Sequence, residues 1–229
     1  MESKRILITG ASRGIGKEIC ISLSALGHKI IAVARNKQLL QNLTDETGCS
    51  SICADLKRSE EIDHIAASIS KDNNKIDVLI HCAGIVRVGK IDNMSLETWQ
   101  EVIAVNLTAP FYLSQVLLSH ISQTGQIIFI NSAAGLQTYP EWGAYCASKF
   151  GLRALADTLR EEVKEKKIRV TSFYPASTDT EIHDNLPYNW DRKKMLTVEN
   201  VAGAVVYCIE QPDNVSIKTI ELENFNGTF

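Results

Sequence analysis

Two residues on one predicted helix could together transfer a proton. Tyr145 and Lys149 stand four positions apart in "YCASK", a spacing that puts both side chains on one face of a helix. A phenol with a pKa of about 10 is a poor base at neutral pH, but a nearby ammonium favours the phenolate and lowers that pKa. Tyr145 could then exchange a proton with a substrate oxygen. The alternative is a chance spacing, with an aromatic core residue beside a surface lysine.

Three glycines follow the first apolar run, in "ILITGASRGIG", at the spacing G-x-x-x-G-x-G. Between a strand and a helix, Gly10 can make a tight turn, Gly14 lets the backbone approach a pyrophosphate, and Gly16 lets the helix pack close to the strand. The helix N-terminus then offers free N–H groups and a partial positive charge to the phosphates. The loop therefore predicts a bound dinucleotide, and a glycine-rich turn without a ligand is the alternative.

The end of the second predicted strand indicates which nicotinamide cofactor is bound. An acidic residue there would hydrogen-bond the ribose 2′-hydroxyl and select NAD. The sequence instead has Ala34, followed by Arg35, and Arg13 lies in the glycine loop. Because guanidinium groups pair bidentately with phosphate, we predict a preference for NADP(H). Two solvated surface arginines are the alternative.

The elements that must position these residues alternate along the chain. Strand-like runs occupy residues 5–9, 29–34, 51–54, 77–81, 126–131, 169–174 and 218–222. Helical periodicity covers residues 16–26, 59–69, 96–121, 144–165 and 198–209. Strands separated by helices predict one α/β domain with a mainly parallel sheet over residues 1–229. The irregular segment 176–197 is long enough to be a functional loop that contacts substrate.

The stretch "TGASRGIG" resembles the short-chain dehydrogenase/reductase family, and the resemblance extends over nearly the whole chain. It implies a Rossmann-like doubly wound fold with helices on both faces of a seven-stranded parallel sheet in the order 3-2-1-4-5-6-7. It also implies a catalytic set of Asn106, Ser132, Tyr145 and Lys149. In the family the serine holds the substrate carbonyl, and the lysine also holds the nicotinamide ribose. The main-chain carbonyl of the asparagine binds a water that extends a proton path to solvent.

The same resemblance implies which residues bind the cofactor. They are Gly10, Ser12, Arg13, Gly14, Ile15, Gly16, Arg35, Asp55, Leu56, Ala83, Gly84, Tyr145, Lys149, Pro175, Thr178 and Thr180. Asp55 would accept a hydrogen bond from the adenine amino group, although a role as a helix N-cap is an equal alternative. The chain departs from the family pattern where His81 and Cys82 replace asparagines and where Ala176 replaces a glycine.

Composition restricts the partners of this 229-residue chain. A net charge of −3 and a pI near 6.0 give no electrostatic case for nucleic acid or an anionic membrane. The sequence shows no signal peptide and no uninterrupted apolar run of 18 residues, so we expect a cytoplasmic location. The six cysteines form no C-x-x-C and are expected to be mostly buried reduced thiols. No catalytic metal is expected, because the sequence has no H-E-x-x-H motif or carboxylate cluster.

Two helical segments, "APFYLSQVLLSHI" and "FGLRALADTL", carry more apolar residues than one sheet face needs. In the family such helices pair across a two-fold axis, so the resemblance implies a homodimer or homotetramer. His28, His64 and His120 lack partners in the sequence pattern and are expected on the surface.

Together these features predict reversible, NADPH-dependent reduction of a ketone or aldehyde to an alcohol, with Tyr145 as the general acid. The substrate itself cannot be read from the sequence, and a 3-oxoacyl carrier-protein reductase stays among the candidates. The alternative from another class is an NADP-binding regulatory or scaffold protein that binds the cofactor without turnover.

Overall fold

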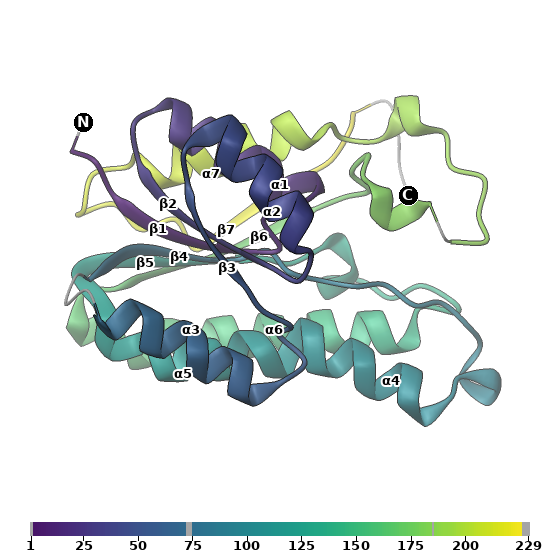
Figure 1. Cartoon of the computed structure of the whole chain (residues 1–229). Coiled ribbons are helices and arrows are strands. Elements are labelled where there is room, and N and C mark those ends of the chain that lie inside the picture. The colour runs from purple at the N-terminus through teal and green to yellow at the C-terminus, as the bar shows by residue number, and fades with distance from the viewer. Residues whose placement is uncertain (1, 72–74, 185, 226–229) are drawn as a thin grey trace.

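A seven-stranded parallel sheet lies between two layers of helices (Figure 1). Its strand order, β3-β2-β1-β4-β5-β6-β7, confirms the predicted order and the predicted fold class. The computed structural model describes residues 2–71, 75–184 and 186–225. Residues 1, 72–74 and 226–229 of the predicted domain 1–229, and residue 185 of the predicted loop 176–197, lie outside the described residues.

The strands are short, and the central ones are rich in aliphatic residues. They are β1 (Arg5–Thr9), β2 (Lys29–Ala34), β3 (Ser50–Cys53), β4 (Ile76–His81), β5 (Ile121–Ile130), β6 (Arg169–Pro175) and β7 (Thr219–Leu222). β1 pairs on both sides, with Leu7 opposite Ile31 of β2 and Leu79 of β4. Because helices cover both faces, these central strands are buried throughout and read as continuous apolar runs rather than alternating ones.

Seven α-helices of the described chain are divided between the two faces of the sheet (Figure 1). One layer holds α1 (Gly14–Ala25), α2 (Lys37–Thr47) and α7 (Val198–Ile209). The other holds α3 (Ser59–Lys71), α4 (Leu96–Ile103), α5 (Ala109–Leu117) and α6 (Gly143–Glu162). Short 3₁₀ turns lie at Ile91–Asn93, Leu118–His120, Ala133–Gly135, Lys164–Lys166, Glu181–His183 and Arg192–Lys194.

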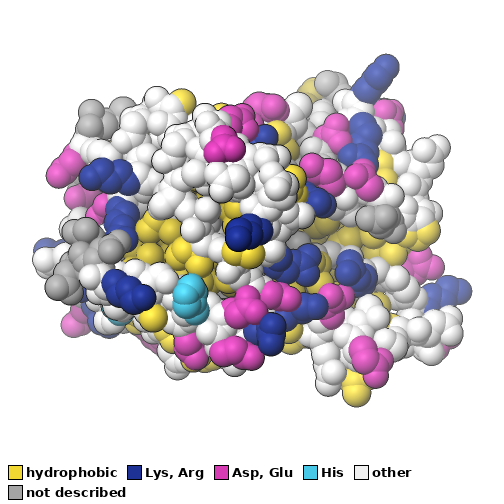
Figure 2. Space-filling view, in the orientation of Figure 1, with side chains coloured by type: hydrophobic (Ala, Val, Ile, Leu, Met, Phe, Trp, Pro, Cys, Tyr) yellow, Lys and Arg dark blue, Asp and Glu magenta, His cyan; other side chains and the backbone are white. Residues whose placement is uncertain are grey.

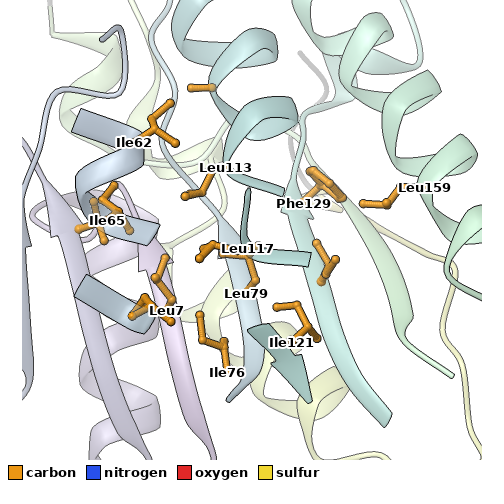
Figure 3. Packing of buried hydrophobic residues seen from close by; sticks show 14 of the residues in the cluster. Leu7, Ile62, Ile65, Ile76, Leu79, Leu113, Leu117, Ile121, Phe129 and Leu159 are labelled. Carbon is orange, nitrogen blue, oxygen red and sulfur yellow. The ribbon is translucent and has the colours of Figure 1, made fainter. Parts of the chain in front are cut away.

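Two apolar cores join the layers to the sheet. On the α3, α5 and α6 side, Leu113 and Leu117 of α5 pack with Leu79 and Phe129 of the strands (Figure 3). A second core, on the α1, α2 and α7 side, is built around residues such as Ile8. Four of the six free cysteines are buried as expected, but Cys53 is exposed and Cys82 is half-buried.

One helix, one strand boundary and one histidine differ from the sequence prediction. Helix α2 was not predicted, although Asn36 accepts a hydrogen bond from the Leu39 N–H at its start and Gly48 ends it with φ 71°. β5 begins at Ile121 rather than at residue 126, because the register shifts between Ile76 and Val78 of β4 and accommodates the extra residues. His28 is buried rather than on the surface, and its Nδ1 accepts a hydrogen bond from the Lys4 N–H at 3.2 Å.

The predicted helix at residues 96–121 is continuous but not uniform. A π-helical turn, Ala104–Thr108, separates α4 from α5. By length and composition the stretch Leu96–His120 could cross a membrane. In this fold, however, Val102, Leu113 and Leu117 of the stretch are buried in the protein interior, as in a core helix of a globular protein.

The predicted functional residues come together at one edge of the sheet. In a parallel sheet the carboxyl ends of all strands share an edge, and ligands bind where the strand order reverses. Here the order reverses between β1 and β4. Acidic and basic side chains are intermixed over the face seen in Figure 2, which agrees with the near-neutral net charge of the chain.

Candidate active site

The glycine loop is built into the fold by close packing around β1. Gly10 has φ 69°, and a Cβ there would lie 2.7 Å from the Cα of Ala83. A Cβ on Gly16 would lie 2.3 Å from the Gly10 carbonyl oxygen. Thr9 ties the loop to the end of β4, because its Oγ1 accepts hydrogen bonds from the Cys82 and Ala83 N–H groups at 3.1 and 3.2 Å. Side chains are therefore excluded from this loop partly by the protein itself.

The N-terminus of α1 fits an anionic ligand. Its N-cap residue, Arg13, provides no side-chain hydrogen bond, and no acidic residue lies in the first turn. The first N–H groups of a helix have no acceptor within the helix, and together with the helix dipole they form an anion site. Gly14, with φ 49°, presents this turn without a side chain. The residues present thus fit the pyrophosphate of a dinucleotide.

The two arginines predicted to recognise a 2′-phosphate are both available. Arg13 and Arg35 are exposed, and neither forms an ion pair within the part of the chain that the structure describes. Ala34 is the last residue of β2, so no carboxylate stands at the ribose position. A positive, acid-free site suits a phosphate better than a hydroxyl.

Asp55 and Leu56 lie differently from the other predicted cofactor residues. The carboxylate of Asp55 accepts a hydrogen bond from the Lys57 N–H at 3.1 Å, so this carboxylate caps the turn that precedes α3. The Leu56 side chain packs in the apolar core. Any contact that Leu56 makes with a cofactor must therefore come from its backbone.

Ser132, Tyr145 and Lys149 converge at the carboxyl end of β5. Ser132 follows the strand, and its Oγ accepts the Ala134 N–H at 3.1 Å, which leaves its hydroxyl hydrogen to donate elsewhere. Tyr145 and Lys149 lie one turn apart on α6, with the Lys149 Nζ 5.7 Å from the centre of the Tyr145 ring. The Lys149 ammonium donates to the Ile130 carbonyl at 3.1 Å, and this contact fixes the long side chain.

Burial shifts the pKa of both groups. It raises the pKa of Tyr145 to about 12, with a hydrogen bond to Ser132 acting in the opposite direction. The lowering expected from Lys149 is therefore not what the structure shows. Burial also lowers the pKa of Lys149 to about 8. At neutral pH Tyr145 is a neutral phenol that can donate its proton.

Asn106 occupies the π-helical turn between α4 and α5. Its side-chain amide accepts the Ile85 N–H and donates to the Ile85 carbonyl, both at 2.9 Å, and it also donates to Ser148 Oγ at 3.1 Å. Pro110, four residues later, has no N–H with which to bond the Asn106 main-chain carbonyl as an α-helix would. That carbonyl thus lacks its α-helical donor and can accept from another group. π-Helical turns are frequent at functional sites.

A cavity of about 580 Å³ opens beside Ser132 and Tyr145. Aromatic rings surround it: Trp142 stacks with Tyr188 at 6.1 Å, and Trp190 meets both of them edge-on at 6.3 and 5.6 Å. Ile15, Pro175, Thr178 and Thr180 line the side toward the glycine loop. The cavity therefore joins the predicted cofactor residues to the predicted catalytic ones.

The loop over this cavity is tied down at its base. The Asp179 N–H bonds to the Leu196 carbonyl at 2.8 Å, and the Leu196 N–H bonds to the Ser177 carbonyl at 2.9 Å. Arg192 pairs with Asp179 at 2.5 Å and with Asp184 at 2.7 Å. Thr180 lies against the glycine loop, since a Cβ on Gly14 would be 3.0 Å from its Cγ2. The predicted functional loop thus covers the cofactor residues.

Sequence reasoning missed several residues of the site. Asn131 precedes Ser132, donates to the Lys149 carbonyl at 3.1 Å and lines the cavity. Ser148 connects Asn106 to α6. The aromatic lining was not predicted residue by residue, although part of it lies in the predicted functional loop 176–197, where His183 and Trp190 meet at 4.8 Å. The signal for Asn131 was its place directly after a buried strand, whereas nothing local marked the others.

A dinucleotide loop at the switch point, facing a serine, a tyrosine and a lysine, is the arrangement of a nucleotide-dependent oxidoreductase. A family model described as short chain dehydrogenase matches residues 4–189. The chain belongs to the short-chain dehydrogenase family.

Individual relatives agree with this family over almost their whole length. An uncharacterised oxidoreductase of Staphylococcus epidermidis is 29% identical over 226 residues, which is 97% of each chain. An alcohol dehydrogenase of Thermococcus sibiricus, solved with 5-hydroxy-NADP, superposes with a TM-score of 0.90 at 25% identity over 99% of each chain. A short chain dehydrogenase of Escherichia coli CFT073, solved with NADPH, superposes with a TM-score of 0.87 at 28% identity over 96% of this chain and 97% of the other.

Proposed function

We propose that this oxidoreductase uses NADPH to reduce a ketone or aldehyde to an alcohol, with Tyr145 as the general acid. The observation that carries the proposal is the convergence of Ser132, Tyr145 and Lys149 beside a cavity that also reaches the glycine loop. Ser132 orients the substrate carbonyl by donating a hydrogen bond. The reaction is reversible in principle.

Support for NADP(H) comes from this chain and from its relatives. The N-terminus of α1 would hold the pyrophosphate, and Arg13 and Arg35 would hold the 2′-phosphate. Lys149 would hold the nicotinamide ribose. The Thr178 backbone would hold the nicotinamide carboxamide, and Thr180 the carboxamide or the pyrophosphate. When bound, the cofactor supplies the hydride. Structural relatives are solved with NADPH and 5-hydroxy-NADP.

The proton comes from the protein. The Tyr145 hydroxyl is protonated at pH 7, since a phenol has a pKa of about 10 and burial raises that of Tyr145 further, so it can protonate the alkoxide oxygen as it forms. Lys149 carries a positive charge next to the same ring, which stabilises the phenolate that remains. The Asn106 carbonyl, without an α-helical donor because of Pro110, can hold a water through which solvent replaces the proton.

The test is a comparison of Tyr145→Phe with the parent protein. The ring still packs while the hydroxyl is lost, so fold and NADPH affinity should persist, and turnover should fall at least about a hundredfold, since general acid catalysis contributes roughly 10²–10⁴-fold. Turnover is followed as NADPH oxidation with a panel of carbonyl compounds, and cofactor affinity by fluorescence. Tyr207→Phe, an exposed tyrosine on α7, is the matched control.

Two further variants separate the roles within the site. Lys149→Ala should lower both turnover and NADPH affinity, and Ser132→Ala should lower turnover while sparing cofactor binding. Near-parental turnover by Tyr145→Phe would refute the assignment. If NADPH bound to the parent protein but no compound were reduced, a regulatory or scaffold role would be supported instead.

A further inference from the structure

The described residues that line the cavity include an acidic side chain but no lysine or arginine. Glu141 is the only acidic residue among these described lining residues. His183 stays neutral because burial lowers its pKa. The remaining walls are mostly apolar or aromatic and include Val86, Leu186 and Trp142.

Two basic residues close to the cavity lining form contacts of their own. Lys149 is buried and directs its ammonium to the Ile130 carbonyl at 3.1 Å. Arg192, on the covering loop, is held by the carboxylates of Asp179 and Asp184. Among the described lining residues, an acidic group on a substrate would therefore meet a carboxylate and no lysine or arginine.

Glu141 is held in place at a conformational cost. Its φ is 69°, a left-handed value that glycine adopts more readily than glutamate. Its main-chain carbonyl accepts the Gly89 N–H at 2.7 Å, and its carboxylate accepts the Tyr188 hydroxyl at 3.0 Å. Strained residues that the surroundings hold in place cluster at functional sites, which points to a use for this side chain.

We propose that the substrate is a ketone or aldehyde carrying an uncharged aryl group, and that Glu141 excludes substrates carrying a carboxylate or phosphate. The proposal rests on the carbonyl reduction proposed above and adds the substrate class. The aryl group would pack among Trp142, Tyr188 and Trp190, since aromatic rings favour edge-to-face and offset contacts. Glu141 provides selectivity through repulsion, because a like charge placed nearby discriminates strongly against the wrong ligand.

The experiment compares two ketones that differ mainly in charge, methyl 4-acetylbenzoate and 4-acetylbenzoate. We expect kcat/KM with NADPH to be at least about tenfold higher for the ester, because the Glu141 carboxylate repels the carboxylate of the other ketone. Glu141→Gln, which keeps an acceptor for the Tyr188 hydroxyl, should lower the ratio of kcat/KM for the ester to kcat/KM for the carboxylate. Glu161→Gln should not, because position 161 lies 16 residues beyond Tyr145 on α6, roughly 24 Å away along the helix.

A binding measurement separates this proposal from the proposed reaction. In Trp99→Phe protein, whose substituted residue is exposed on α4 and outside the cavity lining, Trp142 and Trp190 report ligand binding by fluorescence. The alcohol of the ester should bind at least about tenfold more tightly than the alcohol of the carboxylate, and Glu141→Gln should narrow this difference as well.

Each outcome has a distinct meaning. Turnover of both ketones at equal kcat/KM, or a ratio that Glu141→Gln does not change, would overturn the substrate class and leave carbonyl reduction standing. Selective binding without turnover would support the substrate class and refute the reduction. An absence of both turnover and selective binding would overturn both.

Discussion

The buried ammonium of Lys149 should cost the protein stability at neutral pH. Lys149 lies on α6 and is almost fully buried, and burial lowers its pKa from 10.5 to about 8. Replacing it with methionine keeps a long unbranched side chain and removes the charge. The same substitution removes a residue of the proposed catalytic set, so stability and activity should change in opposite directions.

The size of the effect follows from the two pKa values. A pKa difference of one unit corresponds to about 1.4 kcal/mol, so the lowering from 10.5 to about 8 corresponds to roughly 3 kcal/mol. Methionine also loses the hydrogen bond to the Ile130 carbonyl, which contributes roughly 1 kcal/mol. Lys149→Met should therefore raise the free energy of unfolding by about 2 kcal/mol at pH 7.

The sign of this difference should reverse with pH. Between pH 8 and about 10.5 the unfolded chain holds the Lys149 proton while the folded protein has lost it. The free energy of unfolding of the parent protein therefore rises relative to that of the variant as pH rises. Above this window only the missing hydrogen bond remains, and the variant should be the less stable protein by roughly 1 kcal/mol.

Chemical denaturation of both proteins at several pH values from 7 to 11 measures the difference directly. Other titrating groups cancel in the comparison, and Lys166→Met, in an exposed 3₁₀ turn, provides a matched control that should show no such trend. A difference that stayed constant with pH, or a variant less stable than the parent at pH 7, would contradict the reasoning.

Three further predictions concern the cofactor, assembly and stability. NADPH should bind at least about tenfold more tightly than NADH, because a charge-assisted bond contributes roughly 1.5–3 kcal/mol, and Arg35→Ala should reduce the preference; equal affinities in fluorescence titrations of the parent would refute it. We expect a homodimer or homotetramer through α5 and α6, where Phe111 and Phe150 are 46% and 37% exposed. Phe111→Asp should then shift sedimentation toward a monomer, whereas a parent protein that is monomeric at micromolar concentration would contradict the prediction. Thr197→Ala removes the capping box of α7 and should lower the free energy of unfolding by about 1 kcal/mol, measured in urea; an unchanged midpoint would count against this.

The sheet could be predicted from the sequence, and so could the site residues that a local sequence pattern marks. Gly10, Ser132, Tyr145 and Lys149 each stand at a strand end or on a helix face that the local pattern already indicates. Helix α2 was missed because only Leu40 and Leu43 of its residues are buried, so its apolar periodicity is weak even though both of its ends carry capping signals.

The surroundings of the reacting groups could not be predicted in the same way. The cavity walls join Trp142, at the start of α6, to Tyr188 and Trp190 in a segment more than forty residues away, and no local pattern links them. The raised pKa of Tyr145 results from burial, to which Val86 and Leu186, both far away in the sequence, contribute. Sequence spacing indicated a neighbouring lysine but gave no measure of how much solvent is excluded.

The π-helical turn at Ala104–Thr108 makes the length of this helical run part of the site. Each residue of an α-helix rotates the chain by about 100° about the helix axis. Deleting one residue from the turn would therefore rotate the side chains of α5 relative to those of α4. The shortened helix could not keep both the hydrogen bond between Asn106 and the Ile85 N–H and the positions of Leu113 and Leu117 in the core. A single-residue deletion here would therefore disturb the site or the core, even though it would restore a more regular helix.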